Sequence, residues 1–122
     1  MSELDVKEWM KKADEDLDSA EYLLKGGKLS AAAFFTQQAA EKALKAIYIN
    51  KFGKIWKIHN LVELGKAIGA TYDILELCSD LTPSYVATRY PGLNEKYKKE
   101  EIEELIRYAK TVIKWSKENL QQ

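Results

Sequence analysis

The chain has a single cysteine and no net charge, and each of these facts excludes some classes of protein. Cys78 is the only cysteine among 122 residues, so the chain can form no internal disulfide, and a cytoplasmic setting is expected. Lys and Arg number 19, as do Asp and Glu, which gives a net charge of zero. This balance argues against bulk electrostatic binding of nucleic acid, although it leaves room for a local basic patch.

Long apolar runs and the usual chemical motifs are missing as well. No segment approaches the roughly 20 apolar residues that a membrane-spanning helix needs, and residues 1–12 are too polar for a signal peptide, so no membrane association is expected. One histidine, His59, and one cysteine cannot build the common type of metal site. Gly26-Gly27 matches no phosphate-binding loop, and no serine lies in a nucleophile elbow. We therefore expect no metal and no cofactor.

What remains is a strongly helical pattern. Proline occurs only at positions 83 and 91, and no stretch alternates with a period of two. Length and an apolar fraction of 46% suit one domain over residues 1–122. Capping residues and breakers predict helices over about residues 3–25, 30–52, 60–68, 72–78, 82–90 and 99–119. The predicted fold is all-α: an antiparallel up-and-down bundle of two long helices, a long C-terminal helix and short helices between them.

Two of these boundaries rest on particular residues. Ser2 with Asp5 resembles a capping pair for the first helix, and Gly26-Gly27 supplies its end, so the first two helices should form a hairpin. Thr82-Pro83 predicts a new helix start, with threonine as the cap and proline in the first turn. That helix must end before Pro91.

The second predicted helix carries two contrasting stripes. One stripe is small and apolar and consists of Ala32, Ala39, Ala40, Ala43, Ala46 and Ile47. The opposite stripe mixes charged and large apolar residues, namely Phe34, Gln38, Glu41, Lys45 and Ile49. A helix that lies on a surface is purely polar on its outer face, so this mixed stripe should also meet something. Either the short helices of the chain or a second chain would cover it.

Polar residues at inward positions need partners. Asp16 lies within the apolar stripe of the first helix, where an unpaired carboxylate is costly. Lys42, Lys45 and Arg89 are the candidate partners. A structural ion pair, or a half-exposed aspartate at the edge of the stripe, is favoured over a catalytic carboxylate. Gln38 is interpreted in the same way, as a satisfied structural amide.

Five lysines, at positions 42, 45, 51, 54 and 57, occur in residues 42–59 without any acid. The simpler interpretation is that they complement a helix C-terminus and solubilise a loop. The functional interpretation is a phosphate-binding patch in which Tyr48 and Trp56 stack on bases. His59 closes this run, and helix capping or a backbone hydrogen bond is favoured for it over a role as general base.

Arg89-Tyr90-Pro91 forms the most unusual loop. Arg89 could satisfy carbonyls at a helix end, or it could present its planar fork to a phosphate or carboxylate. Tyr85 lies one turn earlier on the same predicted face.

Four segments together resemble the HEPN domain family. They are Trp9…Ala13…Asp16-Leu17…Ala20, Gln37-Gln38-Ala39-Ala40-Glu41-Lys42-Ala43-Leu44-Lys45-Ala46, His59-Asn60-Leu61…Leu64 and Leu81-Thr82…Tyr85…Thr88-Arg89-Tyr90-Pro91. The resemblance covers nearly the whole chain, and it implies a helical bundle that is often a homodimer. Many small prokaryotic members partner a minimal nucleotidyltransferase in toxin–antitoxin-like pairs, and nucleotide binding has been proposed for the family.

The RNase members of that family place a histidine four to six residues after an arginine. Here Arg89 is followed by Tyr90, Pro91, Gly92, Leu93, Asn94 and Glu95, so the histidine is absent. Metal-free RNA cleavage needs both a base and an acid. The resemblance thus favours a non-catalytic protein that binds a nucleotide or a nucleotidyltransferase. A degenerate RNase with Arg89 as its remaining catalytic residue and a purely structural helical dimer are the alternatives.

The resemblance and the residues together suggest one candidate site. Its expected ligand-binding residues are Arg89, Lys42, Lys45, Tyr85 and Tyr90. Its expected supporting residues are Asp16, Gln38, Glu41 and His59. The ligand would be a nucleotide or RNA.

Overall fold

The computed structural model describes residues 5–89 and 97–120, and of residues 83–89 it describes the backbone alone. These residues form helices and no strand, which confirms the predicted all-α class. The helices are α1 (Val6–Lys25), α2 (Leu29–Phe52), α3 (Leu61–Ala67), α4 (Tyr72–Arg89) and α5 (Lys99–Glu118).

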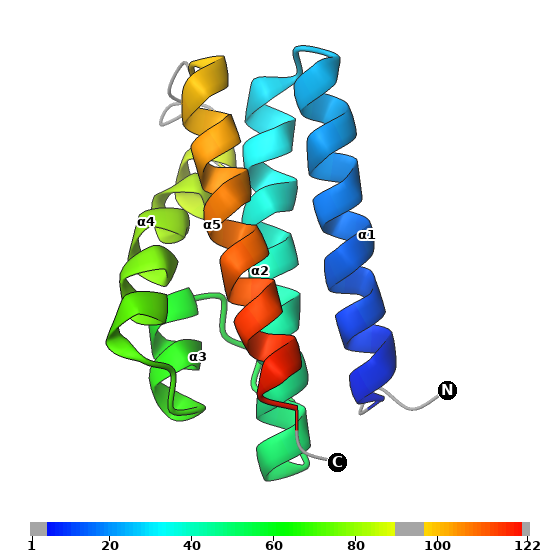
Figure 1. Cartoon of the computed structure of the whole chain (residues 1–122), viewed down its shortest axis with the longest axis vertical. Coiled ribbons are helices and arrows are strands. Elements are labelled where there is room, and N and C mark those ends of the chain that lie inside the picture. The colour runs from blue at the N-terminus through cyan, green and yellow to red at the C-terminus, as the bar shows by residue number, and fades with distance from the viewer. Residues whose placement is uncertain (1–4, 90–96, 121–122) are drawn as a thin grey trace.

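Helix α2 lies at the centre of the bundle. It contacts each of the other four helices, and its contact with α1 is the most extensive. In Figure 1, α1 and α5 lie beside α2 along its length, while α3 and α4 cover its remaining side. Along the chain α1, α2, α4 and α5 run alternately up and down, and α3 is a short insertion between α2 and α4.

The hairpin of α1 and α2 follows from residues at its ends. Asp5 caps α1, since its carboxylate accepts a hydrogen bond from the backbone N–H of Glu8 at 3.2 Å. The other half of the predicted capping pair, Ser2, lies outside the described residues. Gly27 adopts a left-handed backbone with φ of 75° between the two helices, as the predicted stop requires. Gly53, with φ of 67°, ends α2 in the same way.

The prediction of two helices over 72–78 and 82–90 was wrong. One continuous helix, α4, spans the first segment and the second as far as residue 89, and it forms a full member of the bundle. Thr82 does not cap a new helix, because its hydroxyl donates instead to the carbonyl of Cys78 one turn earlier, at 2.8 Å. Ile74, Cys78 and Leu81 are buried in one core cluster with residues of α2, so packing anchors α4 up to the point where local sequence signals indicate a break.

The alanines of α2 form the seams of the bundle. Ala39, Ala43 and Ala46 pack with Met10 and Ala13 of α1 and with Ile113 of α5 in one cluster. Side chains this small let the helix backbones approach closely. The small apolar stripe predicted for this helix is therefore buried as expected.

The mixed stripe on the opposite side of α2 is largely buried as well. Glu41, Lys45 and Ile49 are buried within this single chain, whereas Phe34 and Gln38 stay half-buried. Of the two expected explanations for this stripe, cover by the chain itself holds for those three residues. No helix in the described part of the chain is both long enough and apolar enough to span a membrane.

Candidate functional site

A row of polar side chains is buried on one face of α2. Gln37, Glu41 and Lys45 follow one another at intervals of four residues, which places them on the same side of the helix. Their relative exposures are 0%, 4% and 6%. Charged side chains are almost never buried to this degree unless they are paired, so their partners decide what the row can do.

The carboxylate of Glu41 is the hub of this row. Its Oε2 lies 3.0 Å from Lys45 Nζ and 2.9 Å from His59 Nδ1. Its Oε1 accepts a hydrogen bond from the side-chain amide of Gln37 at 3.2 Å, and Gln37 in turn accepts one from Gln38 at 2.8 Å. We call Gln37, Gln38, Glu41, Lys45 and His59 the Glu41 network.

The Glu41 network is chemically saturated. Both carboxylate oxygens have partners, and no buried side-chain nitrogen or oxygen in the described residues lacks a hydrogen bond. A buried carboxylate–ammonium pair repays its desolvation only when further hydrogen bonds satisfy its remaining groups, and Gln37 and His59 supply these. The network is therefore suited to fixing α2 against the segment before α3 rather than to accepting a proton from a substrate.

His59 connects this network to the surface. Its side chain is half-exposed, and its ring nitrogen lies against the buried Glu41. The capping role expected for it belongs to the next residue, because the Asn60 side chain accepts from the backbone N–H of Glu63 at 3.1 Å and begins α3. The His59 ring instead contacts the Glu41 carboxylate, because the loop after α2 runs back along this helix.

A second ion pair joins α1 to α2. Lys42 Nζ is hydrogen-bonded to Asp16 Oδ2, and the two side chains are largely buried. Asp16 was expected to pair with Lys42, Lys45 or Arg89, and the first of these is the partner observed. The pair ties the middle of α1 to the middle of α2.

The two lysines of the expected ligand site do not act together. Lys42 pairs with α1 through Asp16, whereas Lys45 pairs with Glu41, on the side where His59 lies. In the described residues α1 and α4 make no contact with each other. Lys42 therefore lies on a different side of α2 from the helix that carries Arg89.

Three further residues of the expected site fall outside what can be described. The backbone of Tyr85 and Arg89 belongs to α4, but their side chains are not among the described residues, and neither is any part of Tyr90. The site centred on Arg89 stays a prediction.

Gln37 is the site residue that the sequence interpretation passed over. Gln38 was assigned to the polar stripe instead, three residues from Glu41. The signal was present, because positions 37, 41 and 45 are separated by whole helical turns and carry an amide, an acid and a base. Two adjacent glutamines made the choice between the faces ambiguous.

Comparison with known proteins identifies the family of this chain. The family model described as the HEPN domain matches residues 6–120, which is nearly all of the chain. The chain belongs to the HEPN domain family.

Relatives of this HEPN domain support the assignment. A protein of Methanocaldococcus jannaschii named "Putative toxin MJ1304" is 28% identical over 96% of this chain and 89% of its own length. The crystal structure of TT1696 from Thermus thermophilus matches with a TM-score of 0.85 and 27% identity, covering 93% of this chain and 96% of that one. The crystal structure of ST0689, an archaeal HEPN homologue, matches with a TM-score of 0.83 and 29% identity over 99% and 100%.

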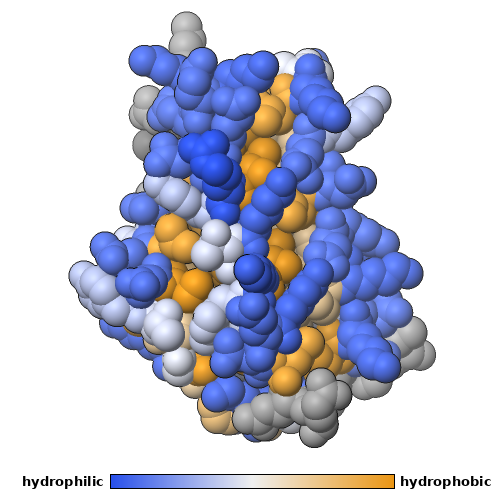
Figure 2. All heavy atoms as spheres, viewed as in Figure 1, coloured by the Kyte–Doolittle hydropathy of each residue, from blue (hydrophilic) through white to orange (hydrophobic). Residues whose placement is uncertain are grey.

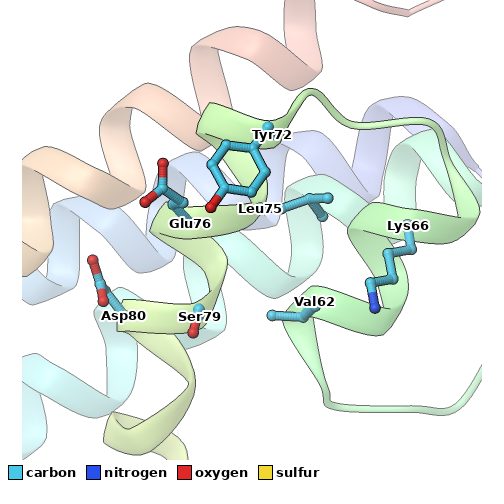
Figure 3. Close-up of a pocket in the computed structure, with 7 residues that line it drawn as sticks. All are labelled: Val62, Lys66, Tyr72, Leu75, Glu76, Ser79 and Asp80. Atoms are coloured by element: carbon cyan, nitrogen blue, oxygen red, sulfur yellow. The ribbon is translucent and has the colours of Figure 1, made fainter.

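A shallow pocket of this HEPN domain lies between α3 and α4. It has a volume of about 530 Å³. Figure 3 shows Tyr72, Glu76, Ser79 and Asp80 along α4, with Val62 and Lys66 of α3 on the other side. Its charged groups are exposed and of both signs, and none of them belongs to the expected site. The geometry favours no particular ligand there.

An apolar strip runs along the surface between α1 and α5. Figure 2 shows it bordered on both sides by hydrophilic residues. Two adjoining pockets lie along it and share Lys110, one of them over Leu17 and Ile113 and the other over Leu24 and Ile106. Ion pairs bridge it, from Glu21 to Lys110 at 3.0 Å and from Asp14 to Lys117 at 2.9 Å. The strip is thus partly closed by the chain's own charges.

Proposed function

We propose that this HEPN domain works as one member of a toxin–antitoxin-like pair, by binding a nucleotide, a nucleotidyltransferase partner or both. Two observations support the proposal. The family assignment covers residues 6–120, and one relative carries a toxin name. The buried charged residues of α2 are engaged in structural pairs with each other, with α1 and with His59, which suits a binding scaffold better than a catalytic centre.

The absence of a histidine after Arg89 is the observation that favours binding over RNA cleavage. No histidine occurs in residues 90–95, directly after Arg89. The only histidine of the chain, His59, lies against the buried Glu41 carboxylate. Arginine holds its proton too tightly to serve as a base, so Arg89 alone cannot activate a 2′-hydroxyl.

Arg89 is the residue that we propose binds the phosphate. A guanidinium presents its donors in a rigid planar fork that matches phosphate oxygens. Tyr85 and Tyr90 would add hydroxyls or stacking faces. Lys42 and Lys45 would contribute mainly by keeping α2 in place through their pairs with Asp16 and Glu41.

Calorimetric titration with ATP and with a short RNA tests this site. The chain offers a matched control, because its other arginine, Arg107, is exposed on α5 and is likewise followed by a tyrosine. We expect Arg89→Ala to abolish ATP binding while Arg107→Ala leaves it unchanged. Equal ATP binding by the wild type and both variants would show that Arg89 is not the phosphate ligand.

A degenerate RNase and a purely structural dimer remain the competing functions. Incubating the protein with RNA in EDTA separates the first, since cleavage that disappears in Arg89→Ala would require an enzyme. If the wild type binds neither ATP nor RNA, cleaves nothing and forms no complex with a partner chain, the structural function holds.

The partner is tested by co-expression with the reading frame beside its gene. We expect expression of one member alone to slow growth of the host and co-expression of both to restore it. Co-purification of the two chains would identify a direct complex. Normal growth in every combination, without co-purification, would contradict the toxin–antitoxin-like pair.

A further inference from the structure

Three aromatic rings gather where α2 ends. Tyr48 and Phe52 lie one turn apart on the helix, with ring centroids 4.7 Å apart. Gly53 then turns the chain back, and the Trp56 ring lies 5.4 Å from Tyr48. Tyr48 thus lies between the other two rings, and we call the three the aromatic platform.

The aromatic platform faces solvent at one side. Phe52 is 50% exposed, while Tyr48 and Trp56 are half-buried at the edge of the main core cluster. The core therefore anchors two of the rings and presents the third. An exposed phenylalanine held against fixed neighbours offers a flat apolar face at little cost in conformational entropy.

Exposed lysines flank the aromatic platform in the sequence. Lys51, Lys54 and Lys57 are exposed and form no ion pair with any described residue. Residues 42–62 contain no acid at all. The C-terminus of α2 carries the equivalent of about half a negative charge, which Lys51 in the last turn offsets. Lys54 and Lys57 follow the helix end and have no ion-pair partner among the described residues.

We propose that the aromatic platform, with Lys51, Lys54 and Lys57, is a binding site for single-stranded nucleic acid. Bases would stack on the exposed Phe52 ring and on the half-buried Trp56, and the lysines would contact the phosphates. This combination of a stacking face with flanking cations characterises sequence-independent binding of single strands. The site is separate from Arg89 and does not depend on the function proposed for it.

Other anionic partners fit this surface less well. An anionic membrane would need a wide apolar face to insert, and Phe52 is the only large apolar residue of the region that is exposed among the described residues. A duplex hides its bases and could use the lysines alone. The rings therefore favour a strand whose bases are free to stack.

Fluorescence anisotropy with labelled oligouridylate and oligothymidylate tests the proposal, with a duplex and phosphatidylserine vesicles as comparisons. The wild type should bind a single strand and prefer it to the duplex and the vesicles. Phe52→Ala should weaken that binding by about 5- to 150-fold, whereas Phe52→Trp should keep it. The two oligonucleotides distinguish RNA from DNA as the source of the strand.

The lysines and a control region sharpen the test. Lys54→Gln with Lys57→Gln should reduce the slope of log affinity against log salt by about 1.4, because two phosphate contacts are lost. The matched control combines Tyr22→Ala, Lys25→Gln and Lys28→Gln, an exposed aromatic and two exposed lysines around the α1–α2 turn. This control should bind as the wild type does. Absence of single-strand binding by the wild type, stronger binding to vesicles or duplex, or unchanged binding by Phe52→Ala would each overturn the proposal.

Discussion

Asp14 and Asp16 lie two residues apart on α1 and both pair with a lysine, yet their surroundings differ. Asp14 meets Lys117 in solvent, with both side chains about half-exposed, whereas Asp16 and Lys42 are largely buried between α1 and α2. Exposed pairs contribute about 0–1 kcal/mol, and breaking a buried pair costs about 3–5 kcal/mol. The degree of burial, rather than the presence of an ion pair, should therefore decide how much the loss of each aspartate destabilises the protein.

We therefore predict that Asp16→Ala lowers the free energy of unfolding by about 2–3 kcal/mol, because Lys42 stays partly in water and so falls below the fully buried range. Asp14→Ala, the control on the same helix, should cost about 0–1 kcal/mol. Urea denaturation of the two variants measures both. Equal effects would mean that the Asp16–Lys42 pair is as well solvated as its neighbour.

Cys78 provides a prediction about reactivity and pH. Burial raises the pKa of the Cys78 thiol from its ordinary value of 9.0 to about 12. The native protein should therefore resist Ellman's reagent at pH 8–9, while the same protein in guanidinium reacts at once. Fast labelling of the native state would show that α4 opens readily at this position.

The same shift has a defined sign for stability. Below the ordinary pKa of the thiol, Cys78 is neutral in both the folded and the unfolded state. As the pH rises from about 9 towards about 12, the Cys78 thiol ionises in the unfolded chain before it does so in the folded protein. This ionisation favours the unfolded chain, so the free energy of unfolding falls progressively over this range. Cys78→Ala should remove that component of the alkaline decline, and urea midpoints across this range would reveal it.

At the scale of the elements, the seam between α1 and α2 depends on small side chains. Ala43 is fully buried in this seam, whereas Ala31 on the same helix is exposed. We predict that Ala43→Trp destabilises the fold by about 1–3 kcal/mol or more through overpacking, and that Ala31→Trp leaves it nearly unchanged. Thermal melts followed by circular dichroism compare the two. A tolerated tryptophan at position 43 would contradict the close approach of the helices.

Helix α4 gives a second prediction at this scale. Proline within a helix lacks the N–H that would bond the preceding turn, so Pro83 weakens a continuous α4. Pro83→Ala should then raise the free energy of unfolding by about 1–3 kcal/mol. At the first position of a separate helix, by contrast, proline is favourable and the same change would lower stability. Denaturation of this variant distinguishes one helix from two by the sign of its effect.

Most of the element boundaries could be predicted because they rest on local signals. Gly27 and Gly53 end helices through backbone conformations that favour glycine, and Asn60 begins one through its side chain. The break expected at Thr82 was wrong because the competing influence is not local. On α4, Ile74, Cys78 and Leu81 precede the expected break and lie in one core cluster with residues of α2, and the helix continues through Pro83 despite the cost of one proline.

The polar sites were predictable only in part, for a related reason. Asp16 needed a partner, and the sequence supplied a short set of candidates that contained Lys42. Choosing between Lys42 and Lys45 requires the rotation of α2 against its neighbours, which periodicity gives only to within a residue or so. The contact of His59 with Glu41 depends on the path of a loop, and no local pattern encodes that path.

At the scale of the whole molecule, the expected homodimer remains a prediction. Glu41, Lys45 and Ile49 are covered within the chain, so Phe34 and Gln38 are what the mixed stripe leaves for a partner. Light scattering at micromolar concentration should give twice the 14.0 kDa of one chain. Phe34→Asp should halve this mass, and Tyr22→Asp, an exposed aromatic elsewhere, should not. A wild type that is monomeric throughout would contradict the dimer.

The central position of α2 also bears on how such a sequence changes over generations. Every other helix rests on it, so one substitution in α2 alters packing against several neighbours at once, and compensation would need simultaneous changes on separate helices. An exposed residue on α1 or α5 contacts mainly water, so it can change without a compensating substitution elsewhere. Divergence in a lineage of this chain should therefore accumulate on the outer helices first, while the alternation of alanine and polar residues along α2 persists longest.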